Sequence, residues 1–542
     1  MPLIRTPSSP SSPSSPWRRL LAGLLAASTA LGSAPALAQG TLPALGESAS
    51  EDLSIGAERR LGEQIMREGR RDPQYLDDPM LLAYLQQLWN PLVAAARARG
   101  DINAETDQAF AWEAFLVRDR SVNAFALPGG YVGVHLGLMQ LTTTADQLAS
   151  VLAHELTHIT QRHIARSIAP QKNATLLSVA TLLLGILAAS RSSNIDGANA
   201  LIMGGQAAAI QGQLNFSRDM EREADRIGYG VLATAGYSAA GMAAMFEKLD
   251  VATRLNDNGG FPYLRSHPLT VDRIAEARNR ALLGGGVQPA PTLQHALMQA
   301  RARVMMDDSA QAWQRFGGGS SSPLLADRVG ALYAGALAAS LLKDHARAES
   351  LAADAQRAAA TATPREAVAE RALTMLQAQL RLARGDAAGT LQVLDTLAAR
   401  SDERPPMLLR AQAVLALQRS APGSQAAALN DSTQALQTWV SAQPMDATAW
   451  ELLASTSEAL GLKLRSMRAA AEARMVVGDL TGAVDRLRAA QQVSRGATGQ
   501  DFIEASVIDA RLRQITAQRR QLQLEARESR GGRSGPEEPL PQ

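Results

Sequence analysis

Three of the chain's seven histidines lie in one short stretch, "VLAHELTHITQRH", at residues 151–163. His154 and His158 are four positions apart, so an α-helix would turn both imidazoles to one side, with Glu155 at the edge of that face. Two neutral imidazoles beside a carboxylate are the metal ligands and the general base of zinc hydrolases. Apolar residues before the first histidine would bury the start of the helix. We therefore predict a catalytic metal-binding helix rather than a solvated helix that is rich in histidine.

A third ligand must come from another part of the chain. On a continuous helix His163 would face away from the first histidine, because nine positions rotate it by about 900°, and we interpret it as a polar residue on the far face. The stretch "MEREAD" carries three carboxylates, of which Glu221 and Asp225 share one helical face while Glu223 points away. We predict Glu221 as the third metal ligand and Asp225 as the acceptor for the free ring N–H of a histidine ligand.

The elements around these residues follow from the spacing of apolar side chains. Helical spacing recurs within 52–98, and apolar runs broken by Pro128-Gly129-Gly130 predict a hairpin within 112–136. One helix is expected over 151–168. The uncharged run 173–189 is about one turn shorter than the roughly 20 residues of a membrane span, and it fits either a buried core helix or a lid or membrane-surface contact.

The second half of the chain is rich in Ala, Leu, Arg and Gln and predicts paired helices. Residues 378–397 and 471–490 share a layout in which a Gly-Asp turn joins two helices, and 336–355 has Lys-Asp at that turn. Near residue 450, Trp450 and Leu453 are placed as packing residues of a repeat helix. We interpret these pairs as degenerate tetratricopeptide-like repeats of about 34 residues, stacked in a solenoid that binds proteins, with a closed helical bundle as the alternative.

Composition excludes several classes of function. The chain has no cysteine, which excludes disulfides, thiolate metal sites and cysteine nucleophiles. Its formal net charge is only +2, and no basic patch is interleaved with aromatic residues, so nucleic-acid binding is not expected.

The N-terminus has the pattern of a secretory signal peptide. Arg18 and Arg19 precede an apolar run that ends at Ala36-Leu37-Ala38, which predicts cleavage after Ala38 and export of a soluble mature chain. A start codon assigned too early and a twin-arginine route both stay open. With no cysteine after the cleavage site, a bacterial lipoprotein anchor is not expected, and no stretch of the mature chain is a convincing transmembrane helix.

Two of these motifs, taken together, resemble a known family of proteins. "HELTHITQRH" followed by "FSRDMEREADRIG" resembles the gluzincin metalloproteases that include HtpX and the CAAX prenyl endopeptidase. With a signal peptide before this region and repeat-like helices behind it, the chain is most similar to the BepA-like periplasmic members. The resemblance implies one zinc ion per chain, held by His154, His158 and Glu221, with Glu155 as the catalytic base.

Two further segments of the chain are similar to functional segments of the same family. "NAFALPGGYVGVHLGLM" is similar to the family's active-site β-edge, which implies that Gly130, Tyr131, Val132 and Gly133 bind substrate as an added strand. "RSHPLTVDRIAEA" is similar to a loop whose histidine can occupy the fourth zinc position. His267 would then displace the catalytic water and hold the enzyme latent, or it would only cap the next helix.

The implied fold class is α+β: a mostly helical zincin-type metalloprotease domain with a small β-sheet, followed by an all-α tetratricopeptide-like solenoid. The implied function is a periplasmic zinc endopeptidase with a chaperone-like role in outer-membrane β-barrel assembly and quality control. Unfolded or misassembled outer-membrane proteins are the expected substrates, and the assembly machinery is the expected partner of the repeats. One alternative is a chaperone whose zinc site is mainly regulatory, and another is a general scavenger protease.

The expected domains are a signal peptide at 1–38, the protease at 39–283, a linker at 284–291, repeats at 292–525 and a disordered tail at 526–542.

Overall fold

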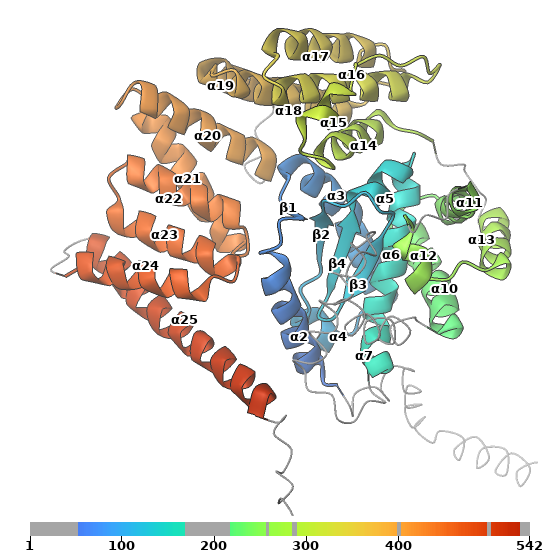
Figure 1. Ribbon diagram of the computed structural model, residues 1–542, viewed down its shortest axis with the longest axis horizontal. Helices are drawn as coiled ribbons and strands as arrows, with labels where there is room; N and C mark the ends of the chain where they lie inside the picture. The colour runs from blue at the N-terminus through green and yellow to red at the C-terminus, as the bar shows by residue number, and fades with distance from the viewer. Residues whose placement is uncertain are drawn as a thin grey trace, which may run out of the picture. The chain divides into compact units, whose positions relative to one another are not determined.

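A computed structural model describes residues 53–168, 217–255, 260–283, 290–397, 403–495 and 500–531 (Figure 1). The predicted signal peptide, the apolar run 173–189 and most of the predicted linker lie outside these residues. Within the part of the chain that is described, no helix is both long and apolar enough to cross a membrane.

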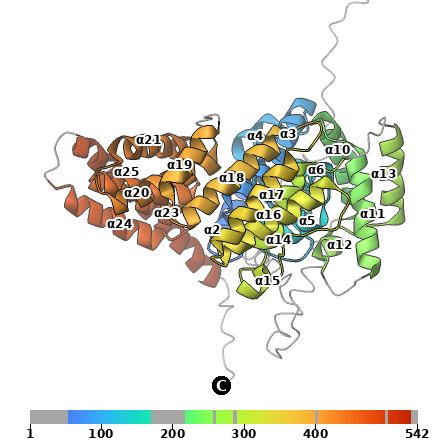
Figure 2. The same ribbon diagram turned by 90° about the horizontal axis from the view of Figure 1, so that it is seen from above.

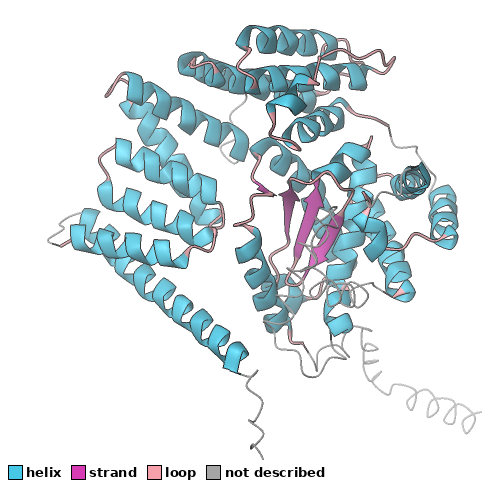
Figure 3. Ribbon diagram, viewed as in Figure 1, coloured by secondary structure: helices cyan, strands magenta, loops and turns pink. Residues whose placement is uncertain are grey.

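One small sheet forms the centre of the N-terminal part (Figure 3). Its strand order is β1-β2-β4-β3; β2 and β4 are parallel, whereas β3 and β4 are antiparallel. The predicted hairpin is confirmed, because β3 and β4 meet at a turn in which Gly129 and Gly130 have φ of 77° and 91°. Only glycine adopts such values without strain. The strands are β1 (Tyr75–Leu76), β2 (Glu113–Val117), β3 (Ala124–Leu127) and β4 (Tyr131–His135).

The predicted substrate edge at Gly130, Tyr131, Val132 and Gly133 is wrong for this sheet. β4 lies between β2 and β3, so its backbone hydrogen-bonding groups face two strands rather than an open edge. The edge position was implied by the family resemblance alone, and the parallel pairing of β2 with β4 places β4 inside the sheet. In the described sheet, β3 forms the edge beyond β4.

Helices surround the sheet, and their ends follow from local sequence. Asp78 caps α3 by accepting a hydrogen bond from the Leu81 N–H, Pro79 occupies the first turn, and Gly100 ends the helix in the left-handed conformation. Helix α6 packs against α3, α10, α11 and the sheet, and the views in Figures 1 and 3 show it beside α10. The helices of this part are α2 (Ile55–Gly69), α3 (Pro79–Arg99), α4 (Ala104–Ala109), α5 (Leu136–Leu141), α6 (Ala145–Thr160), α7 (His163–Ile168), α10 (Arg218–Thr234), α11 (Ala240–Leu255), α12 (Pro262–Ser266) and α13 (Val271–Leu283).

The C-terminal part is entirely helical in the residues described. Its predicted turns are confirmed: Gly385 and Gly478 have φ of 90° and 77°, and the following residues, Asp386 and Asp479, cap the next helices. The described helices are α14 (Leu293–Met305), α15 (Ala310–Gln314), α16 (Leu325–Leu341), α17 (His345–Ala359), α18 (Ala367–Ala383), α19 (Ala387–Thr396), α20 (Arg404–Ser420), α21 (Ala426–Ala442), α22 (Ala447–Ala459), α23 (Lys463–Val476), α24 (Leu480–Val493) and α25 (Gln500–Gly531).

One predicted boundary differs from the structure. Helix α25 continues to Gly531, past the end of the predicted repeat domain at 525. Helix α14 packs most extensively on α16, and it also contacts α3 and α5 and shares their hydrophobic core. Figure 2 shows α14 beside α16. The mostly helical α+β class is confirmed, while the tetratricopeptide assignment stays a prediction.

Candidate metal centre

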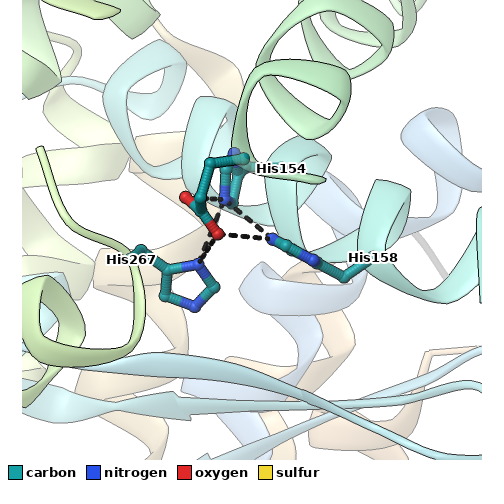
Figure 4. A group of neighbouring side chains, drawn as sticks. His154, His158 and His267 are labelled. Carbon is teal, nitrogen blue, oxygen red and sulfur yellow. Dashed lines mark hydrogen bonds and ion pairs between the residues drawn. The ribbon is translucent and has the colours of Figure 1, made fainter. Parts of the chain in front are cut away.

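Four buried side chains converge at one point between α6, α10 and the residue after α12 (Figure 4). They are His154 and His158 on α6, Glu221 in the first turn of α10, and His267. One possible ligand atom from each lies within 4.8 Å of the others. The structure therefore brings together the three predicted ligands and the predicted loop histidine.

The distances between these atoms are close to those between ligands that share one metal ion. The Nε2 atoms of His154 and His158 are 3.0 Å apart, and His267 Nδ1 lies 3.3 Å from His154 Nε2. His267 Nδ1 is also 2.9 Å from Glu221 Oε1, and His158 Nε2 is 3.4 Å from that oxygen. Ligands bound to zinc at about 2.0–2.1 Å in a tetrahedron are roughly 3.3 Å apart. The donor set, imidazole nitrogen with one carboxylate, is also a set that zinc accepts.

Helix α10 reaches the site because it packs closely on α6. Ser217 caps α10, which fixes the first turn that carries Glu221. Gly228 faces the α6 backbone, where a Cβ atom would lie 3.1 Å from the Ala153 carbonyl oxygen. Glycine at this position lets the two helices approach, and the four-residue spacing brings Asp225 to the same face as Glu221.

Asp225 and Arg273 form hydrogen bonds and ion pairs with the candidate ligands on the side away from the candidate metal position. Asp225 Oδ1 is 3.0 Å from His154 Nδ1, the ring nitrogen opposite the one that faces the other ligands. Arg273 on α13 donates two hydrogen bonds to Asp225 and forms an ion pair with Glu221 at 2.8 Å. It also donates to the Pro268 carbonyl oxygen, which ties the His267 loop to the same cation. Sequence reasoning missed Arg273, and its only signal was its place in the segment that carries His267.

Glu155 is fully buried, and neither of its carboxylate oxygens accepts a hydrogen bond from the described residues. The imidazole of His267 approaches it, with Nε2 at 3.5 Å from Oε1. Leaving a buried carboxylate without hydrogen-bond partners costs free energy, so such a group requires an explanation by function. A cation and a water molecule beside Glu155 would supply that explanation.

The charges of the cluster depend on one another. Burial alone would lower the pKa of His154, but the carboxylates of Glu221 and Asp225 outweigh it and raise that pKa to about 10. Burial holds the pKa of the neighbouring His158 well below its ordinary value. Burial would raise the pKa of Glu221, but His267 and His154 lower it strongly, so this carboxylate stays ionised. The carboxylates of the cluster therefore favour positive charge among the histidine rings.

His267 does not cap α13. Thr270 does so, since its hydroxyl oxygen accepts a hydrogen bond from the Arg273 N–H at 3.3 Å. The imidazole of His267 instead stacks on the buried ring of Tyr263, with ring centroids 4.7 Å apart. The capping interpretation of His267 is therefore wrong, and its side chain belongs to the candidate metal centre.

His163 is also placed differently from the prediction. Helix α6 ends at Thr160, and Arg162 has φ of 52°, so α7 starts in a new direction with His163. His163 is therefore not rotated by 900° from His154, because the two residues do not lie on one continuous helix. His163 is fully buried and contacts His158, and burial lowers the pKa of His163 to about 4.

Comparison with known proteins agrees with this geometry. The model of Peptidase family M48 matches residues 83–281. A putative beta-barrel assembly-enhancing protease of Vibrio cholerae is 39% identical over 277 residues, which cover 50% of this chain and 54% of the relative. The beta-barrel assembly-enhancing protease of Escherichia coli K12 is 37% identical over 266 residues, or 49% of this chain and 52% of the relative.

A third relative aligns along most of the chain. The beta-barrel assembly-enhancing protease of Yersinia pestis is 30% identical over 487 residues, which cover 88% of this chain and 92% of the relative. The chain thus spans about half the length of the Vibrio and Escherichia relatives and nearly all of the Yersinia relative. It belongs to the M48 metallopeptidases, in the group of the beta-barrel assembly-enhancing proteases.

Proposed function

We propose that this chain is a zinc-dependent endopeptidase that holds one zinc ion through His154, His158 and Glu221. The observation that carries the proposal is the convergence of these three side chains beside Glu155, a buried carboxylate that accepts no hydrogen bond within the described residues. Membership of a metallopeptidase family supports the same chemistry. Asp225 fixes the tautomer of His154 by accepting its Nδ1–H, which leaves Nε2 to bind the metal.

Peptide hydrolysis at this site needs a general base and a positioned substrate. Zinc, when bound, supplies Lewis acidity that polarises the scissile carbonyl and lowers the pKa of water to about 7. Glu155 takes the proton of the attacking water and returns it to the leaving amine. An extended substrate would pair with β3, the edge strand of the described sheet, which packs against α6.

The proposed substrates are outer-membrane β-barrel proteins that are unfolded or stalled during assembly, and the proposed compartment is the periplasm. The names of the relatives, beta-barrel assembly-enhancing protease, support the substrate class. The signal-peptide pattern that ends at Ala38 supports export. The word protease in those names also favours catalysis over a chaperone with a regulatory zinc site. The C-terminal helices would contact the assembly machinery.

Replacing the general base tests the catalytic assignment. Glu155→Gln keeps the shape of the side chain but cannot accept a proton, so cleavage of an unfolded outer-membrane protein should fall about 10²- to 10⁴-fold. The variant should still bind one zinc ion. Glu247→Gln, at a half-exposed site on α11, is the matched control and should cleave as wild type. Wild-type cleavage by Glu155→Gln would overturn the proposal.

His267 is proposed to occupy the fourth zinc position and to hold the enzyme latent. Three protein ligands are enough for a catalytic zinc, so His267→Ala should keep the metal and open the position that water needs. Basal cleavage should then rise severalfold, measured with the same substrate. His345→Ala, at the start of α17, serves as the distant histidine control. Unchanged or lower cleavage by His267→Ala would reject the latch while leaving the metal assignment intact.

A further inference from the structure

We propose that His163 is a positioning residue for the metal ligand His158. The inference rests on the proposed zinc function and adds a residue that is neither a ligand nor the general base. His163 Nδ1 lies 2.8 Å from His158 Nδ1, the ring nitrogen on the side away from the candidate metal centre. Both rings are fully buried, with centroids 4.9 Å apart and planes at 74°. An edge-to-face contact of this kind directs a nitrogen of one ring at the other.

The hydrogen bonds have one consistent direction when His158 binds metal through Nε2. Its Nδ1 then carries the proton and donates to His163 Nδ1, which leaves the proton of His163 on Nε2. That Nε2–H donates to Glu223 Oε2 at 3.0 Å, and Arg166 contacts the same oxygen at 3.0 Å. The relay from His158 through His163 to Glu223 therefore fixes the tautomer that the ligand needs.

The backbone is built to aim His163 at His158. Arg162 has φ of 52°, a left-handed conformation that is costly for a residue other than glycine. Its guanidinium is buried and held by Glu58 on α2 at 2.9 Å and by the Leu53 carbonyl oxygen. These contacts stabilise the break between α6 and α7. On a continuous helix His163 would face away from the centre.

The two histidine ligands are thus supported in different ways. His154 meets a carboxylate directly, through Asp225, whereas His158 reaches its carboxylate through a neutral imidazole. The sequence predicted the first support from helical spacing and placed Glu223 away from the metal. Glu223 does not contact the metal ligands, but it accepts the hydrogen bond from His163 and so supports His158 indirectly.

Zinc affinity separates a positioning role from a purely structural one. We would measure the zinc dissociation constant of the full mature chain by competition with a chromophoric chelator, together with the melting temperature of the zinc-free protein. His163→Leu removes the acceptor and should weaken zinc binding about 10- to 100-fold. His163→Asn places an amide oxygen near the position of Nδ1 and should restore most of the affinity.

His295→Leu is the matched control. His295 is also a buried histidine with both ring nitrogens hydrogen-bonded, to the Tyr84 hydroxyl and the Thr142 carbonyl oxygen, but it is not part of the metal cluster. Its replacement should lower the melting temperature and leave zinc affinity unchanged. A His163→Leu variant that melts lower but binds zinc as wild type would overturn the proposal.

A second variant covers the case in which His163→Leu does not fold. Glu223 lies at the partly exposed end of the relay, so Glu223→Ala should be tolerated and should weaken zinc binding by less than His163→Leu. Wild-type affinity in Glu223→Ala would remove Glu223 from the relay, and with an unfolded His163→Leu it would reject the proposal. If the wild-type chain itself bound no zinc, the proposed function would fail, which is a distinguishable result.

Discussion

Two buried clusters of charged residues differ in how completely their positive and negative charges are paired. Where α14 meets α3, Arg301 forms a bidentate pair with Asp78, at 2.7 and 2.8 Å, and donates further to Tyr333 and Gln379. Asp78 also caps α3, so each charge is matched. This cluster, which we call the α3–α14 joint, needs nothing beyond the chain.

In the candidate metal centre, the carboxylates outnumber the guanidinium groups. Its carboxylates are Glu155, Glu221 and Asp225, and the guanidinium that pairs with two of them belongs to Arg273. If the imidazoles are neutral, as ligands of a metal ion would be, three carboxylates face one guanidinium and the net charge is minus two. A divalent cation would balance it. Comparing the clusters teaches that an incomplete buried charge balance marks a binding site, whereas a complete one holds helices together.

The largest expected effect comes from removing the guanidinium in each cluster. Arg301→Met leaves Asp78 buried without its partner, so the free energy of unfolding should fall by about 3–5 kcal/mol whether or not zinc is present. Arg273→Met should cost a similar amount in the zinc-free protein and less with zinc, which still neutralises Glu221. Chemical denaturation with and without zinc measures both.

Arg278→Met is the control for this comparison. Its guanidinium is more than half exposed and pairs with Glu247 at the surface, so its loss should change stability by less than about 1 kcal/mol. Equal losses for Arg273→Met with and without zinc would contradict the charge argument.

A smaller effect is expected from pH at His295, a buried residue of α14 that contacts Tyr84 of α3. Burial lowers the pKa of His295 to about 4, whereas the unfolded chain takes up this proton near pH 6.5. The folded state is therefore fully stabilised above about pH 6.5 and loses up to about 3 kcal/mol as the pH falls to 4. His295→Leu should reduce this loss relative to wild type. Identical pH dependence in the two proteins would show that His295 is not held neutral.

The smallest effect is expected at a turn of the C-terminal helices. Asp479 caps α24 by accepting the Gly482 N–H at 2.9 Å, so Asp479→Ala should lower the free energy of unfolding by about 1 kcal/mol. Zinc affinity should not change, since this cap is not part of the metal cluster. Altered zinc binding would mean that the two parts of the chain are coupled.

Local periodicity explains what could be predicted from sequence. His154 with His158 and Glu221 with Asp225 are pairs within single helices, so a four-residue spacing places each pair on one face. The Gly-Asp turns of the C-terminal helices were predictable for a similar reason, because Gly385 and its neighbour act locally.

The features that were missed depend on tertiary structure. Arg162 breaks the helix without a glycine or proline, held in place by Glu58 from a distant segment, so His163 was misplaced. Arg273 joins the site across 48 residues. The parallel pairing of β2 with β4, which moved the predicted substrate edge inside the sheet, leaves no signal in the order of the strands.

The most direct test is zinc K-edge absorption spectroscopy on the purified mature chain, combined with metal analysis. One zinc ion per chain should be found, bound by imidazole nitrogen and carboxylate oxygen at about 2.0–2.2 Å, and it should be lost when His158 and Glu221 are both replaced by Ala. A chain that carries no metal after exposure to zinc, or a double variant that keeps the wild-type spectrum, would contradict the account.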